Sequence, residues 1–90
     1  MSTVKFPAVL RANVGGAREV DADGETIGDV LSALIATYPS LKDQLFTEDG
    51  ELNRFVNVYV NGQDVRYLDG TATPVAERDE VRLLPAMAGG

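Results

Sequence analysis

The chain of 90 residues contains no cysteine and no histidine. Without cysteine it has neither a disulfide framework nor a thiolate nucleophile, and without histidine it lacks the side chain whose ordinary pKa lies closest to neutrality. Zinc sites built from these two residue types are excluded. Because no paired acidic motif stands out either, we expect a protein that is not an enzyme, with no catalytic residue, metal site or bound cofactor of its own.

Long apolar runs and clusters of basic residues are also missing. No apolar run approaches the ~18 residues that cross a membrane, and the opening MSTVKFPAVL lacks the charged cluster and apolar stretch of an export signal. The net charge of −6 disfavours nucleic acid, whose phosphates require clustered lysine and arginine. We therefore expect a cytoplasmic protein without membrane or nucleic-acid partners. Its negative charge either attracts a protein with a basic docking surface or serves solubility.

The composition that remains, 44% hydrophobic and 24% charged, is typical of one small globular domain. Residues 3–10 alternate in polarity and predict a strand, in which Pro7 marks a bulge or an edge position. Gly15-Gly16 can adopt the positive φ of a chain reversal, and residues 18–22 predict a second, antiparallel strand. The inward residues expected in these strands are Val4, Phe6, Ala8, Leu10, Val20 and Ala22.

The clearest helix is predicted at residues 26–38. Thr26 can cap its start, with Asp29 three residues further on, and Pro39 ends it because proline disfavours helical geometry in the residue before it. Gly28 either marks a close approach of the helix to the sheet or is a tolerated imperfection. The apolar stripe that helical spacing predicts to be buried is Ile27, Val30, Leu31, Leu34, Ile35 and Tyr38.

The second half of the chain predicts shorter elements. Leu41 and Leu45 stand one helical turn apart, and a polar loop follows at residues 47–53. The segment FVNVYV alternates strongly and predicts a strand at residues 55–60. Its core face would be Val56, Val58 and Val60, and its opposite face Phe55, Asn57 and Tyr59.

Asn61-Gly62 is the strongest hairpin signal in the chain, so residues 63–70 are expected to return as a brief strand. The last strand is predicted at residues 79–85, with Val81 and Leu83 inward and Arg82 and Leu84 outward. One amphipathic helix must then cover one sheet, because no other element can bury its stripe. This order predicts an α+β fold compatible with a ubiquitin-like β-grasp, a mixed sheet with its last strand in the middle.

The chain ends in LLPAMAGG. Pro85 cannot donate a ladder hydrogen bond, so we expect a β-grasp domain at residues 1–84 and a flexible tail at residues 85–90. The final glycines lack Cβ, which lets an enzyme close tightly around the backbone. The α-carboxyl group is ionised at neutral pH and can attack the α-phosphate of ATP when another protein neutralises the charges. A frayed chain end or a cloning remnant is the alternative.

With these features the chain resembles the ubiquitin-like sulfur carriers of the ThiS/MoaD group over nearly its whole length. The segments FPAVLRANVGGAREV, LNRFVNVYVNGQDVRYLDG and LLPAMAGG carry the resemblance, which is greatest to the carriers of actinobacterial cysteine synthesis. It implies that an activating enzyme of the MoeB/MoeZ kind adenylates Gly90 with ATP and Mg²⁺. A persulfide sulfur then displaces AMP and leaves a C-terminal thiocarboxylate.

The resemblance also implies acceptors for this sulfur. A pyridoxal-phosphate-dependent cysteine synthase would use it, and a metalloprotease would release cysteine from the carrier. Other sulfur-accepting synthases serve thiamin, molybdopterin and thiosugar synthesis. The chain supplies the acyl group and its delivery, while the chemistry belongs to those enzymes.

The resemblance assigns roles to the tail residues one by one. Gly90 is the group modified, Gly89 is its slender neighbour, and Met87 and Ala88 line the partner's channel. Separately, the strand alternation places four side chains on the sheet face away from the helix, near the root of the tail. These are Phe55, Tyr59, Arg82 and Leu84. They form either a docking patch for the partner or merely scattered surface residues.

Three other functions are compatible with the sequence. The adenylated glycine of a protein modifier passes to lysines of other proteins. The small subunit of molybdopterin synthase inserts its tail into a larger catalytic partner, and a plain interaction module has no use for its glycines. The sequence does not decide the pathway served, the oligomeric state or whether Gly90 is the native terminus.

Overall fold

The computed structural model describes residues 2–85, and Met1 and residues 86–90 lie outside this range. Within it, no helix combines the length and apolar character needed to cross a membrane. In chain order the elements are β1 (Ser2–Lys5), α1 (Ala8–Arg11), the 3-10 turn η1 (Ala12–Val14), β2 (Glu19–Ala22), α2 (Ile27–Thr37), α3 (Leu41–Leu45), β3 (Val56–Val60), β4 (Gln63–Asp64), the 3-10 turns η2 (Val65–Tyr67) and η3 (Gly70–Ala72), and β5 (Glu80–Pro85).

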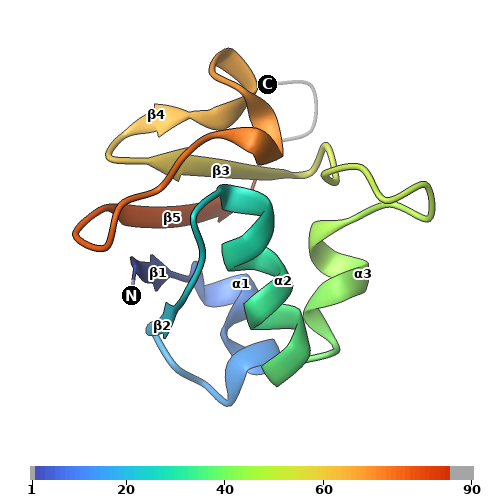
Figure 1. Ribbon diagram of the computed structural model, residues 1–90. Coiled ribbons are helices and arrows are strands. Elements are labelled where there is room, and N and C mark those ends of the chain that lie inside the picture. The colour runs from blue at the N-terminus through green and yellow to red at the C-terminus, as the bar shows by residue number, and fades with distance from the viewer. Residues whose placement is uncertain (1, 86–90) are drawn as a thin grey trace.

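The five strands form one mixed sheet in the order β2-β1-β5-β3-β4 (Figure 1). β5, the last strand of the chain, lies in the middle, parallel to β1 and antiparallel to β3. The outer pairs, β1 with β2 and β3 with β4, are antiparallel. This arrangement confirms the predicted α+β β-grasp architecture. α2 is the main helix, and its buried side chains share one core with those of the sheet.

α2 forms where the sequence predicts it. The Thr26 hydroxyl accepts a hydrogen bond from the Asp29 backbone N–H (3.2 Å) and caps the first turn. The helix ends at Thr37, before Pro39. A Cβ added at Gly28 would lie 3.3 Å from the Thr71 carbonyl oxygen. Gly28 therefore marks a close approach to the η3 turn, and its predicted approach to the sheet was wrong.

The strand predicted at residues 3–10 is wrong beyond Lys5. Pro7 is the N-cap of α1, and its carbonyl accepts a hydrogen bond from Leu10 N–H (3.0 Å). Proline suits the start of a helix because it has no N–H to leave unsatisfied there. Leu10 is buried as predicted, but now from a helix, whereas Ala8 is exposed. Alternating and helical spacing coincide over so short a segment, so periodicity alone could not distinguish them.

The remaining connections follow local turn chemistry. Gly15 and Gly16 both have positive φ (66° and 83°) and reverse the chain before β2. Asn61 and Gly62 also have positive φ (50° and 87°), as a two-residue hairpin loop with both central residues left-handed requires. β4 spans only two residues before η2 begins, so the return strand predicted at residues 63–70 is much shorter than expected.

Candidate functional site

The root of the predicted tail is the end of the central strand. β5 runs through Pro85, which pairs in register with Val56, while Leu83 pairs with Val58. Val81 and Leu83 are fully buried, so the core and both neighbouring strands hold β5 in place. The chain therefore leaves the domain from a rigid position at Pro85.

The tail residues themselves lie outside the described part of the chain. Gly90 as the modified group and Met87, Ala88 and Gly89 as channel residues therefore remain predictions. The same holds for the predicted boundary between the domain and a flexible tail.

Three of the four predicted docking residues lie together on the sheet face away from α2. Tyr59 on β3 pairs directly with Arg82 on β5. Both line one shallow hollow of about 450 Å³ with Leu84. Phe55 is not part of its lining, but it is 60% exposed and precedes Val56, the partner of Pro85. Tyr59, Arg82 and Leu84 thus share the exposed face, with Leu84 directly before the tail root at Pro85, and Phe55 is exposed one residue before β3.

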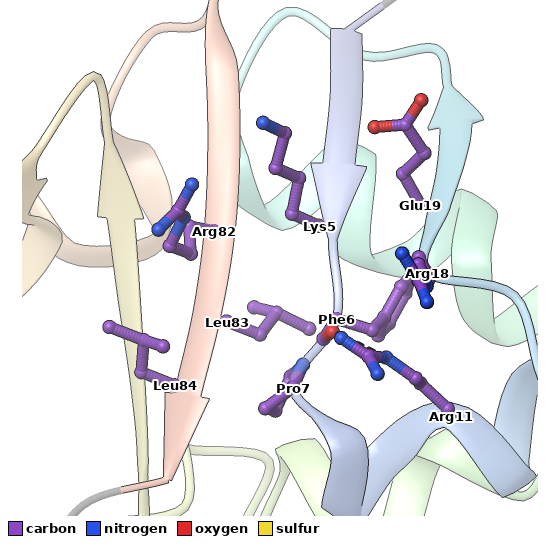
Figure 2. Close-up of a pocket in the computed structure, with 9 residues that line it drawn as sticks. All are labelled: Lys5, Phe6, Pro7, Arg11, Arg18, Glu19, Arg82, Leu83 and Leu84. Carbon is purple, nitrogen blue, oxygen red and sulfur yellow. Dashed lines mark hydrogen bonds between the residues drawn. The ribbon is translucent and has the colours of Figure 1, made fainter.

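A second hollow, of about 350 Å³, opens between β5, β1, β2 and α1 (Figure 2). We call it the basic groove. Its cationic lining residues are Lys5, Arg11, Arg18 and Arg82, half of the chain's eight lysines and arginines. Phe6, Pro7, Leu83 and Leu84 supply its apolar walls, and Glu19 is its acidic lining residue.

Sequence reasoning missed Lys5, Arg11 and Arg18. These cations are dispersed along the chain and meet only because the strands pair and α1 folds back beside them. Lys5 stands beside Glu19 in the β1–β2 ladder and beside Arg82 in the β1–β5 ladder. Two signals were missing: the residue-level register between the strands, and the helix α1 at Ala8–Arg11, which was not predicted.

Ion pairs hold the upper part of the groove. The Lys5 ammonium lies 2.6 Å from Glu80 Oε1, and Arg82 Nη2 lies 3.8 Å from Glu80 Oε2. The hydrogen bond from Lys5, supported by the charges of Lys5 and Arg82, lowers the pKa of the Glu80 carboxyl below its usual value. Because the three side chains are between 40% and 48% exposed, solvent weakens these pairs, which position Lys5 and Arg82 more than they stabilise the fold.

The turn before β5 is fixed by a second set of hydrogen bonds. Asp79 accepts from the Ala76 backbone N–H (2.8 Å) and from the Asn61 side-chain amide (2.9 Å). These two bonds, with the nearby charge of Arg78, lower the pKa of Asp79. Asn61 in turn accepts from the Glu80 N–H (3.0 Å). The start of β5 is thereby tied to the β3–β4 hairpin.

These two surfaces offer charged and apolar side chains for non-covalent contacts. No group of three or more His, Cys, Asp or Glu side chains in residues 2–85 could hold a metal ion. The hollow on the sheet face offers an aromatic ring, a guanidinium and an aliphatic side chain, and the groove offers positive charge. Both adjoin the strand that leads to the C-terminus.

Known proteins match the sequence of this chain over nearly its full length. The sequence model of the ThiS family matches residues 4–90. The sulfur carrier protein CysO of Mycobacterium tuberculosis is 47% identical over 90 residues, covering 98% of this chain and 97% of that protein. Small archaeal modifier protein 3 of Haloferax volcanii is 43% identical over 90 residues, covering 97% of this chain and 96% of that protein.

Solved structures match the fold of this chain over nearly its full length. The crystal structure of M. tuberculosis CysO superposes with a TM-score of 0.91 at 44% identity, covering 97% of this chain and all of the other. The crystal structure of the Amycolatopsis orientalis BexX/CysO complex contains a chain that superposes with a TM-score of 0.91 at 38% identity, with complete coverage of both chains.

Proposed function

The chain belongs to the ThiS family, and we propose that it is a sulfur carrier whose C-terminal Gly90 is converted to a thiocarboxylate. The observation that carries the proposal is that its similarity to this family continues to residue 90, through the terminal Gly-Gly. The described residues offer recognition surfaces and no metal-binding cluster. The similarity of the chain to the sulfur carrier protein CysO supports a role as a protein substrate of other enzymes and not as an enzyme itself.

The reactive group is the terminal carboxylate. One of its oxygens attacks the α-phosphorus of ATP and displaces pyrophosphate, which forms an acyl-adenylate at Gly90. An activating enzyme of the MoeB/MoeZ kind supplies the ATP and Mg²⁺ and neutralises the phosphate charges. Hydrosulfide from a sulfide source then attacks the acyl carbon and displaces AMP. AMP carries away one of the former carboxylate oxygens, and sulfur takes its place in the thiocarboxylate.

The folded domain fixes the point from which the tail starts. β5 is central and buried on its inward face, so the tail starts from a defined point at Pro85. Tyr59, Arg82 and Leu84, with Phe55 beside them, are proposed to dock the activating enzyme. Without Cβ atoms, Gly89 and Gly90 suit a narrow channel, and Met87 and Ala88 would line its entrance.

For the destination of the sulfur we propose cysteine synthesis. The support is the high similarity to CysO over nearly the full length of both chains. A pyridoxal-phosphate-dependent synthase would accept the sulfur, and a metalloprotease would then release the product from the carrier.

A second function, conjugation to lysines as a protein modifier, has its own support. Small archaeal modifier protein 3 is 43% identical over nearly the full length of both chains. Both functions share the adenylated glycine and differ in the group that attacks it. Recovery of lysine-linked adducts from cells would favour the modifier, whereas transfer of sulfur to a small molecule favours the carrier.

Intact-mass analysis tests the proposal. The chain is incubated with its MoeB/MoeZ-type enzyme, ATP, Mg²⁺ and a sulfide source, and we expect one oxygen replaced by sulfur at Gly90. A variant lacking Gly89 and Gly90, and a reaction without ATP, are the controls and should show no change. If an active, matched enzyme leaves the wild-type chain unmodified, the sulfur-carrier function is wrong.

A further inference from the structure

In the basic groove, two arginines contact the backbone of Phe6, one through its side chain and the other through its carbonyl. The Phe6 N–H donates to the Arg18 carbonyl (2.9 Å), and the Phe6 carbonyl accepts from Arg11 Nε (3.2 Å). Arg11 comes from the last turn of α1, and Arg18 directly precedes β2. Figure 2 shows both guanidinium groups on the same side of β1, near Phe6 and Pro7.

These two arginines carry uncompensated charge. Lys5 and Arg82 share the carboxylate of Glu80, whereas neither Arg11 nor Arg18 pairs with a carboxylate among residues 2–85. Arg11 is oriented by its bond to Phe6, and Arg18 is exposed. A chain of net charge −6 thus presents a local excess of positive charge in this groove.

The position of the groove connects it with the tail. Leu84 lines the groove and is followed by Pro85, the last residue described. Leu84 also lines the hollow on the sheet face. Both surfaces therefore lie beside the residue from which the tail starts, where a protein that holds the C-terminal residues approaches the domain.

From this geometry we propose that the basic groove docks an acidic segment of the activating enzyme, with carboxylates paired to Arg11 and Arg18. Guanidinium groups bind carboxylates in bidentate geometry, and a volume of about 350 Å³ admits side chains of this size. Nucleic acid is a poorer occupant because the positive charge is confined to one groove of an acidic chain. This inference rests on the proposed function and adds a partner surface to it.

The negative net charge of the whole chain, taken alone, favours a partner with a basic docking surface. At the groove the local charge is positive, so the complementary surface of the partner at this place is expected to be acidic. Charge complementarity of this kind acts mainly on encounter and docking, so it should appear in KM and in salt dependence.

The test measures pyrophosphate release by the MoeB/MoeZ-type enzyme with the full-length chain as the varied substrate, at low and high potassium chloride. Arg18→Glu should raise KM about tenfold at low salt with little change in kcat, and the difference should shrink at high salt. Arg18→Gln should give a smaller rise. The matched controls Lys42→Glu and Arg78→Glu reverse exposed charges outside the groove and should stay within about twofold of wild type.

The substitutions at Arg18 are expected to leave the fold intact. The Arg18 side chain has no partner among the described residues, and its backbone carbonyl keeps its bond to Phe6 in both variants. Equal unfolding midpoints of wild type and Arg18→Gln confirm that the comparison concerns docking alone.

Several outcomes would overturn the inference. Equal effects of Arg18→Glu and Lys42→Glu would remove the groove from the interface, and a lower KM for Arg18→Glu would mean that it faces a basic surface. Inhibition by inorganic phosphate of wild type but not of Arg18→Glu, at matched ionic strength, would make the groove a site for free phosphate. An unmodified wild-type chain would instead refute the proposed function, and this inference with it.

Discussion

Leu83 and Leu84 are neighbours in β5 but point to opposite faces of the sheet. Leu83 is fully buried against α2 and the other strands, whereas Leu84 is 36% exposed on the face away from α2. One strand therefore contributes to the core through one residue and to the exposed face through the next. The central position of β5 makes this possible, because its edges are already paired.

Leu83→Ala should lower the free energy of unfolding by about 2–5 kcal/mol, because it leaves a cavity in a fully buried site. Leu84→Ala should change it by less than about 0.5 kcal/mol, as exposed substitutions usually do. Urea unfolding followed by circular dichroism measures both values. Similar losses for the two variants would contradict the assignment of their faces.

Tyr59→Ala should raise the KM of the activating enzyme for the chain about tenfold, because a docking ring in the hollow beside Arg82 is lost. The unfolding midpoint should change little. Tyr67→Ala is the matched control, since Tyr67 is 89% exposed and lines neither hollow beside β5. If both tyrosine variants behave like wild type in steady-state kinetics, the docking role of this hollow is refuted.

Gly89→Val should reduce the rate of adenylation about a hundredfold, since a branched side chain beside the reacting carboxylate obstructs a narrow channel and displaces the terminus. Stability should stay unchanged. Ala36→Val adds the same side chain to the exposed surface of α2 and should be adenylated normally. Normal adenylation of Gly89→Val would show that the partner encloses the tail loosely.

Asp79 should make stability depend on acid pH. Its pKa in the folded chain is lowered by the hydrogen bonds from Ala76 and Asn61, so the folded state favours the ionised carboxylate. The resulting stabilisation is present above the unfolded pKa of about 4 and is lost as the pH falls through the lower folded value. Asp79→Asn should weaken this loss in urea titrations between neutral pH and acid.

Asp43→Asn, on the exposed surface of α3, is the control for that titration. It should retain the acid dependence of the wild-type chain. An equally flat profile for both variants would assign the effect to overall charge instead of the Asp79 turn.

Much of the fold was predictable because its signals are local. The stripe on α2, the Thr26 cap and the Asn61-Gly62 turn each depend on residues a few positions apart. The structure confirms the cap, the turn and four of the six stripe residues, whereas Ile35 and Tyr38 are only partly buried. The error at residues 6–11 has the same origin. Phe6 and Leu10 fit both an alternating strand and a helix that starts at Pro7, and packing selected the helix.

The candidate site likewise has one part that local sequence signals predict and another part that they do not. Tyr59, Arg82 and Leu84 were predictable because strand alternation assigns each to the exposed face, and the β-grasp arrangement, with its last strand in the middle of the sheet, brings them together. The approach of Arg11 to Arg18 was not predictable, because no local pattern links the end of α1 to the residue before β2. Their approach depends on α1 folding back to the backbone of Phe6.

The amino-acid sequence by itself determined the elements, the inward and outward faces of the strands and the chemical character of the Gly-Gly terminus, since these follow from side-chain spacing and type. Only the tertiary structure decided where positive charge collects on an acidic chain. The parallel pairing of β1 with β5 brings Lys5 beside Arg82 across most of the sequence. Electrostatic potential depends on distances in space, and pairing between remote segments sets those distances.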